Sequence, residues 1–284
     1  MKKIAKLSLV AAVAVAGFTT ANAQPLEEAI KNVDVSGSVV YRYNDWNNDK
    51  SGTTKDASDN NYKVGLNLSS KVNEDVKFNS RLIVGGTDAG WAADGLNAQD
   101  GGDANPGVTL SNAYFGYTGV KNTTVNVGKQ GLTTPWTVAI DSDGNEQTGT
   151  GILALSTVGP VTLAGAFFNQ TNLDASGDAV IAGTTSGKSV SATSLFKGDE
   201  DIATVGAIVA AGPVTLDAWY LDMNDTFDTY TVGAKSSLDL SGAKVGIDAR
   251  YASLTFDKAT ATALRPAISS TTAVEDSNSM AKIA

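Results

Sequence analysis

Histidine and cysteine, two residue types that often carry catalysis, are both missing from this 284-residue chain. Nucleophilic mechanisms that pair serine or cysteine with a histidine base are therefore excluded by composition. A pair of carboxylates can act without histidine, and Asp141 lies only two residues before Asp143. In a glycine-rich segment, however, such acids more often face water or line a passage. The sequence therefore predicts a protein that is not an enzyme.

The acidic stretch "DSDGNEQTGTGI" at 141–152 matches a calcium-binding loop only in part. An EF-hand loop requires glycine at position six and a bidentate glutamate at position twelve. Here Gly144 stands at position four and Ile152 at position twelve. Weak calcium binding by Asp141, Asp143 and Glu146 stays open, and no other metal or cofactor is expected. The glycine pairs at 85–86 and 101–102 lack a strand-to-helix setting, so a phosphate-binding loop is not expected.

The elements that carry these acids have the patterning of β-strands. Over residues 33–43 apolar side chains such as Val35 and Val39 alternate with polar ones such as Ser36 and Arg42, so one face is apolar and the other polar. The same alternation recurs over 61–70 and 75–84. Further strands are predicted near 112–118, 123–130, 150–158, 161–169, 202–210, 214–222, 229–238 and 243–254, which makes about eleven strands.

The connections between these strands alternate in length. Short ones at 71–75, 119–122, 158–160, 211–213 and 239–242 alternate with longer ones at 45–61, 86–109, 131–149, 170–201 and 223–228. This rhythm, with a mean hydropathy of −0.07, is typical of an all-β antiparallel transmembrane barrel with short periplasmic turns and long surface loops. The stretch 189–196 is assigned to the fourth long loop, because a single extra strand would break the alternation.

Aromatic residues gather near the two ends of the predicted strands, where rings prefer the membrane interface. The group beside the long loops is Tyr43, Trp46, Tyr62, Phe167, Phe168, Trp219, Tyr220, Tyr230 and Tyr251, and the group near the short turns is Phe78, Phe115 and Tyr117. In a soluble sandwich these rings would be core residues spread along the strands. Their placement therefore favours a barrel with two aromatic girdles.

The N-terminus has the features of an export signal. Three lysines precede an apolar run at 7–18, and Ala21-Asn22-Ala23 supplies a cleavage site, so residues 1–23 are predicted as a signal peptide. Its removal takes away three lysines and no acids, which changes the formal charge from −9 to −12. That charge disfavours nucleic acid and favours cations as partners. Residues 24–32 are predicted as a short periplasmic helical turn before the first strand.

Two stretches resemble the campylobacter-type major outer membrane porin family: "QPLEEAIKNVDVSGSVVYRY" at 24–43 and "GKQGLTTPWTVAIDSDGNEQTGTG" at 128–151. The resemblance implies a trimeric porin barrel of 16 to 18 strands in the cell outer membrane, whose third loop, here at about 131–149, folds inward and narrows the channel. Members of that family are longer and end on a strand with a terminal aromatic residue. On this reading the chain is short or truncated at its C-terminus, and 255–284 is a polar loop or tail.

The resulting hypothesis is a passive channel for small hydrophilic solutes and ions, with a preference for cations. Its constriction acids are Asp141, Asp143 and Glu146, and its pore-lining basic residues are Arg42, Lys63, Lys77, Arg81, Lys129 and Arg250. Strict alternation assigns Lys129 to the lipid face with Val127, whereas the resemblance suggests a pore-facing base. A twist or bulge would reconcile the two.

The expected partners are outer-membrane lipid, the barrel-assembly machinery and further copies of the chain in a homotrimer, besides the solutes and cations themselves. Two other function classes remain open at this stage. One is a non-transporting surface barrel that acts as an adhesin or structural protein, and the other is a soluble secreted β-protein.

Overall fold

The computed structural model describes residues 32–46, 57–84, 94–95, 107–140, 144–173, 181–183, 188–190, 197–240, 242–262 and 277–283. Its strands are β1 (Val33–Trp46), β2 (Ala57–Lys71), β3 (Val76–Val84), β4 (Asp94–Gly95), β5 (Val108–Tyr117), β6 (Thr123–Gly131), β7 (Thr148–Val158), β8 (Val161–Thr171), β9 (Ile181–Gly183), β10 (Lys188–Val190), β11 (Ile202–Ala211), β12 (Val214–Met223), β13 (Phe227–Leu240), β14 (Ala243–Phe256) and β15 (Ser277–Ile283). Among the described residues, no helix is both long and apolar enough to cross a bilayer.

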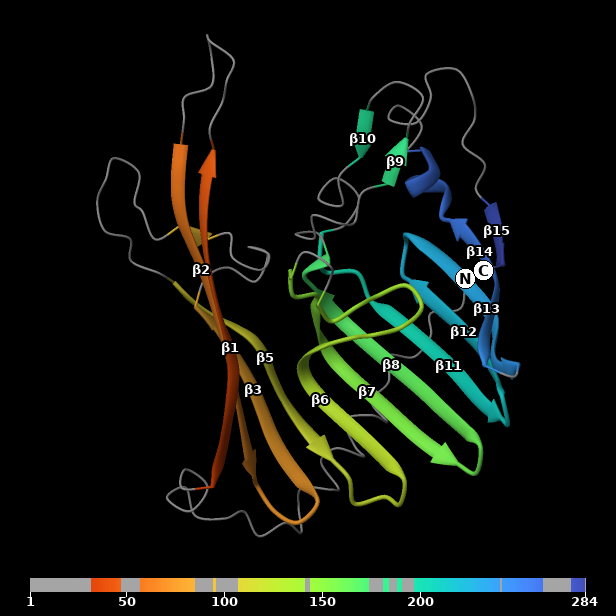
Figure 1. The fold of residues 1–284 in the computed structure, drawn as a ribbon, viewed down its shortest axis with the longest axis horizontal. Helices are drawn as coiled ribbons and strands as arrows, with labels where there is room; N and C mark the ends of the chain where they lie inside the picture. The colour runs from red at the N-terminus through yellow and green to blue at the C-terminus, as the bar shows by residue number, and fades with distance from the viewer. Residues whose placement is uncertain are drawn as a thin grey trace.

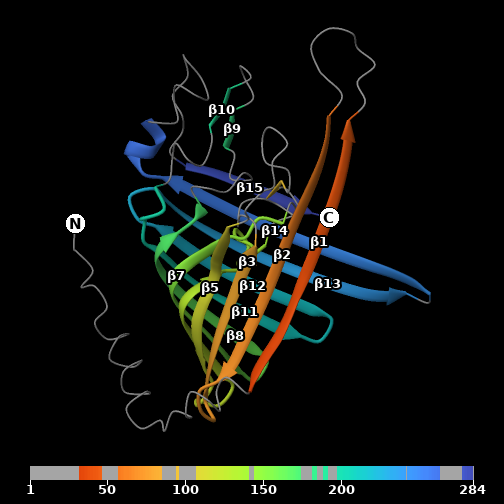
Figure 2. The same cartoon turned by 90° about the vertical axis from the view of Figure 1, so that its left-hand side faces the viewer.

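One antiparallel sheet contains most of these strands, in the order β1-β2-β3-β5-β6-β7-β8-β11-β12-β13-β14-β15. Each strand therefore pairs with its neighbours along the chain, apart from the short β4, which adds to β2, and the separate β9–β10 pair. The sheet curls strongly, and its concave side faces the viewer in Figure 1. Its end strands are β1 and β15, so the described residues form an open barrel wall (Figure 2). The predicted all-β antiparallel class is confirmed.

All eleven predicted strands are present, and two expectations need correction. The segment 255–284, expected as a polar loop or tail, contains β15, which pairs with β14 from Thr255↔Ser277 to Ala249↔Ile283. Backbone pairing with a neighbour stabilises this strand although its own sequence has weak alternation. The connection at 223–228, expected as a long loop, is a three-residue turn at 224–226, in which Asp225 has a φ of +56°. The predictions for 1–31 and 191–196 lie outside the described residues.

The short turns have the residues that their geometry requires. Gly159 and Gly212 each stand before a proline in a two-residue turn, with φ of +59° and +60°. Glycine at a positive φ followed by proline is the pattern of a type II′ turn, whose twist suits antiparallel hairpins. In the β2–β3 turn, Asn73 Oδ1 accepts hydrogen bonds from the amides of Asp75 and Val76, both at 2.9 Å. These turns lie at one rim of the sheet, and the strand ends that lead into the long connections lie at the other (Figure 1).

The two faces of the sheet differ in polarity. The convex face, here the outer face, exposes a band of large apolar side chains, including Val39 at 77% and Val205 at 59%. Most of the predicted girdle aromatics lie in this band: Tyr43, Phe167, Tyr220, Tyr230 and Tyr251 near the long connections, and the Phe78–Phe115 pair, with ring centroids 5.1 Å apart, near the short turns. An apolar outward band is expected for strands that face lipid.

Among the predicted girdle residues whose side chains the structure describes, Phe168 and Trp219 belong to the concave, or inner, face. Phe168 follows the outward Phe167, and successive strand residues point to opposite faces. It is 1% exposed and packs with Ile202, Leu221 and Met223. Trp219 has the same parity as Leu221, and its ring covers Gly206 on the neighbouring strand. These rings therefore pack inside the curl and not toward lipid.

Candidate functional site

The connection between β6 and β7 is residues 132–147, and its described parts, 132–140 and 144–147, lie on the concave side of the sheet (Figures 1 and 2). We call it the third loop. Near its return to β7, Glu146 is 3% exposed, and its Oε1 accepts a hydrogen bond from Arg81 Nε at 2.8 Å and forms an ion pair with Arg81 Nη2 at 2.8 Å. Ser111 donates its hydroxyl hydrogen to Oε2 of the same carboxylate. Lys63 donates from Nζ to the Gly144 carbonyl at 2.7 Å. These five residues form what we call the loop anchor.

The hydroxyl of Ser111 reaches Glu146 because of a β-bulge. Between β3 and β5, Arg81 pairs with Asn112 and Leu82 pairs with Leu110, so Ser111 is an extra residue in the ladder. A bulge of this kind changes the direction in which a side chain points. It brings a fully buried hydroxyl to the second oxygen of the carboxylate, so both carboxylate oxygens have donors.

The backbone beside Glu146 is held independently of its side chain. Asn172, just after β8, donates from Nδ2 to the Glu146 carbonyl at 2.7 Å and accepts from the Thr148 amide at 2.7 Å. The Gln147 amide donates to the Ala139 carbonyl at 3.0 Å, which joins the two legs of the loop. The third loop therefore has a defined backbone path where it meets the wall.

The first leg of the third loop has an apolar attachment. Leu132 and Trp136 pack against the cluster of Phe168, Ile202, Leu221 and Met223 on the inner face. Thr134 Oγ1 accepts hydrogen bonds from the amides of Trp136 and Thr137, at 3.1 and 3.2 Å, which fixes the turn that presents the indole. The loop is thus attached to one part of the wall by ionic hydrogen bonds and to another by apolar packing.

Of the predicted constriction acids, only Glu146 lies within the described residues. Asp141 and Asp143 fall in 141–143, which lie outside them. Among the described residues no group of three potential metal-ligating side chains is close enough to hold a metal ion. Weak calcium binding by these three acids therefore stays a prediction, and the two oxygens of Glu146 already accept hydrogen bonds from Arg81 and Ser111.

Five of the six predicted basic residues separate into three groups. Lys63 and Arg81 meet in the loop anchor. By register, Arg42 and Lys77 share their inner face: Val40, two residues before Arg42, pairs with Lys63, and Lys77 lies four residue pairs from Arg81 in the ladder. Arg42 and Lys77 are exposed. Arg250, on the distant strand β14, has a different partner.

Arg250 forms a second ion pair on the inner face. Its Nη1 and Nη2 donate to the two oxygens of Asp217 on β12, at 2.9 and 2.7 Å. Gly233 lies between them in the register of the three strands, and a Cβ there would be 2.5 Å from both partners. The guanidinium therefore crosses β13 at the one position without a side chain. This bidentate geometry is the strong form of the arginine–carboxylate contact.

Lys129 lies apart from these groups. It pairs with Ala113 and Thr150 in a register that continues from Val127, so it belongs to the outer face, and its Nζ donates to the Leu110 carbonyl at 2.9 Å. The bulge that would turn it inward does not occur in the β5–β6 ladder. The structure therefore follows the alternation at this position, and the suggested pore-facing placement is wrong.

Sequence reasoning missed an apolar strip on the inner face. Leu155, which is 41% exposed, pairs with Ala164, and Ala164 pairs in turn with Gly206. Gly206 lies under the Trp219 ring. Alternation alone assigns apolar side chains to the lipid side, so no sequence signal distinguished this strip. The cross-strand pairs decide its face, because directly paired residues point the same way.

The model of the Campylobacter major outer membrane protein family matches residues 1–281. The chain belongs to this family. The family places the protein in the outer membrane, as the sequence predicted. A search of curated proteins found no sequence match to this chain.

Solved structures of outer-membrane porins share the fold of this family member at low sequence identity. They include Pseudomonas aeruginosa OccK8 (OprE), with a TM-score of 0.55, 16% identity and coverage of 80% of this chain and 54% of that one. A BenF-like porin from Pseudomonas fluorescens Pf-5 has a TM-score of 0.56 and 15% identity, and the match covers 81% of this chain and 59% of that one. Pseudomonas aeruginosa OpdK with vanillate has a TM-score of 0.57 and 13% identity, and the match covers 89% of this chain and 63% of that one. The chain thus spans a little over half the length of these porins.

Proposed function

We propose that this protein is an outer-membrane porin that passes small hydrophilic solutes and ions through a lumen narrowed by its third loop. The observation that carries the proposal is the loop anchor, because Arg81, Ser111 and Lys63 hold the third loop against the inner face of the wall. A loop fixed inside the curl reduces the cross-section that solutes can use. The family and the porin-like fold support a channel and not an enzyme.

We further propose a preference for cations, which depends on Asp141 and Asp143. Glu146 is compensated by Arg81, and Arg250 is compensated by Asp217. The negative formal charge of the chain then acts on ions mainly through acids that lack such partners. In the sequence, Asp141 and Asp143 lie between the two attachments of the third loop, and a narrow passage strengthens the effect of a charge on a passing ion.

The test uses the full protein extracted from outer membranes in detergent and inserted into planar bilayers. Stepwise conductance in potassium chloride is expected, together with a reversal potential that favours cations in a salt gradient. Replacing Asp141 and Asp143 by asparagine should lower the cation-to-anion permeability ratio without lowering the thermal stability. Absence of conductance by correctly folded protein would favour the adhesin or structural alternative. A folded protein that stays in solution without detergent would favour the secreted β-protein.

Assembly is the remaining part of this proposal. We propose that the protein reaches the membrane through the barrel-assembly machinery and functions as a homotrimer, as the family resemblance implies. The outer-face band of apolar residues provides surface for lipid and for neighbouring copies. Crosslinking in intact outer membranes should give a trimer, and a monomer at all crosslinker concentrations would contradict this part.

A further inference from the structure

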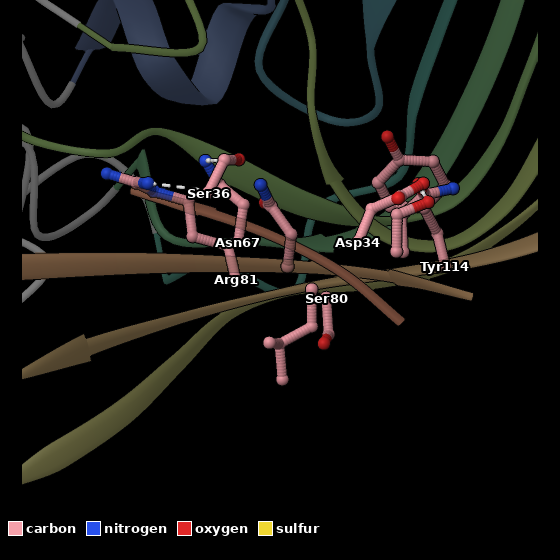
Figure 3. A pocket seen from close by; sticks show the side chains of 10 residues that line it. Asp34, Ser36, Asn67, Ser80, Arg81 and Tyr114 are labelled. Carbon is pink, nitrogen blue, oxygen red and sulfur yellow. Dashed lines mark hydrogen bonds between the residues drawn. The ribbon is translucent and has the colours of Figure 1, made fainter. Parts of the chain in front are cut away.

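The inner face differs in polarity between two parts of the sheet. On β1, β2, β3 and β5 it lines a polar pocket (Figure 3), in which Arg81 Nη1 donates to Asn67 Oδ1 at 2.8 Å. On β7, β8, β11 and β12 it carries the apolar strip, which consists of Leu155, Ala164, Gly206 and Trp219. The interior of a membrane barrel is ordinarily polar, so the apolar strip departs from the usual pattern.

The indole of Trp219 is the main surface of the apolar strip. A Cβ at its cross-strand partner Gly206 would be 2.1 to 2.5 Å from three atoms of the ring, which is closer than a side chain allows. The φ of Gly206 is not positive, so the contact with the ring, and not the backbone conformation, requires glycine there. The ring therefore rests on the sheet through one face. Because Trp219 is only half-buried, its other face is presented to the lumen.

The apolar strip lies beside the attachment of the third loop. The first leg of that loop packs on the cluster that includes Leu221, and Trp219 is two residues from Leu221 along β12, on the side of the short turns. Leu155, at the other end of the strip, is 41% exposed, so the described parts of the loop do not cover it. Lipid and neighbouring copies contact the outer face. What reaches the strip therefore comes through the lumen.

The polar groups next to the apolar strip are already paired. Thr204 and Thr231, which are 3% and 1% exposed, each donate their hydroxyl hydrogen to a backbone carbonyl of the next strand at 2.8 Å. Arg250 and Asp217, one inner position nearer the short turns, form a bidentate ion pair whose charges compensate each other. The surroundings therefore favour neither sign of charge. A solute contacts the strip through an apolar face, and the flat indole favours a flat one.

We propose that the apolar strip is a subsite for neutral, water-soluble solutes that carry a flat aromatic ring, which stacks on Trp219. The inference rests on the proposed porin function, because the solute reaches the strip through the lumen. Two strand spacings, about 10 Å, separate β11, under the indole, from β7, which carries Leu155. A bicyclic ring on the indole extends over Ala164 to the Leu155 side chain. The polar groups of the solute stay in water, so binding is weak and reversible, as passage requires.

The test measures binding and conduction separately on the same detergent-purified protein. Adenosine is the probe, because it is neutral, soluble in water and carries a flat bicyclic ring, and ribose, which lacks that ring, is the ligand control. Saturation-transfer difference NMR should show binding of adenosine and not of ribose. Conductance in potassium chloride without either solute reports the channel. A conducting protein that binds adenosine no better than ribose overturns this inference alone, whereas a folded protein that binds adenosine and does not conduct overturns the porin proposal.

Variants of the apolar strip identify the site. Trp219→Ala should weaken adenosine binding about tenfold, within the range for one lost stacking contact with a base, and Trp219→Phe, which keeps a ring, should weaken it less. Leu155→Ala should weaken it about threefold through lost apolar contact. Leu163→Ala is the matched control, because Leu163 is 49% exposed on the outer face of the neighbouring strand β8, and it should leave binding unchanged.

The pair of leucine variants decides the result even if Trp219→Ala does not fold. Equal adenosine binding by Leu155→Ala and Leu163→Ala overturns the inference. So does a folded Trp219→Ala protein, with an unchanged heat-modifiable gel shift, that binds adenosine as tightly as the wild type.

Discussion

The loop anchor predicts a specific effect of Glu146→Gln on channel behaviour. The substitution keeps the size of the side chain but removes the charge that accepts from Arg81 at 2.8 Å and from Ser111. Hydrogen bonds to a charged group contribute about 1.5–3 kcal/mol, and leaving one partner of a buried ion pair alone costs about 3–5 kcal/mol. Because Arg81 keeps some access to water, with 15% of its side chain exposed, we expect a cost of about 2–4 kcal/mol.

That cost applies to the attached position of the third loop. A difference of about 2–4 kcal/mol raises the population of the detached loop roughly 30-fold to several hundred-fold, since about 1.4 kcal/mol corresponds to a factor of ten. The backbone contacts of Asn172 and the packing of Trp136 remain, so the wall itself should stay folded. Single-channel recordings should therefore show frequent transitions to a wider, noisier conductance state.

The permeability ratio provides the internal control. Glu146→Gln leaves the Arg81 charge uncompensated, so the preference should move toward anions. Arg81→Met combined with Glu146→Gln removes both charges of the pair and should return the ratio to the wild-type value, while the conductance noise stays high. If the double variant keeps the shifted ratio of the single variant, Glu146 acts as a free pore charge and the pairing argument is wrong. Quiet channels in both variants would show that the anchor does not hold the loop.

The remaining predictions concern the wall. Gly233→Ala places a Cβ 2.5 Å from Arg250 and Asp217, and overpacking of this kind typically costs about 1–3 kcal/mol. The variant should therefore lower the midpoint temperature of the heat-modifiable gel shift. Gly246→Ala is the control, because a Cβ at that position on β14 has no atom within 4 Å, and it should leave the midpoint unchanged. Val205→Arg, on the outer face, should cost about 2–4 kcal/mol if it lies near the membrane midplane, whereas Leu155→Arg, on the inner face, should be tolerated in folding. If urea titrations show equal losses of unfolding free energy for Val205→Arg and Leu155→Arg, the assignment of the two faces is wrong. Ser111→Ala should raise the conductance noise less than Glu146→Gln does, because Arg81 still holds the carboxylate.

Local patterning explains why the strands were predictable. The side-chain period of a strand is two, so the alternation over 33–43 and 61–70 marks both the strand and its faces without knowledge of any partner. The turns were predictable for the same local reason, because Gly159-Pro160 and Gly212-Pro213 contain residues that favour a reversal. β15 was missed because its stabilising contacts are with the backbone of β14 and its own sequence has weak alternation.

Only the tertiary structure decided how the charges are used. Arg81 and Glu146 are 65 residues apart, and their contact depends on the bulge at Ser111, which arises from the β3–β5 register and has no local signal. Arg250 reaches Asp217 because the register places Gly233 between them. The inner position of Leu155 and Trp219 likewise follows from cross-strand pairs and not from hydropathy. Composition and alternation thus determined an exported antiparallel barrel protein with a charged interior, whereas register, a property of strand pairs, determined which charges compensate each other and which groups remain for solutes.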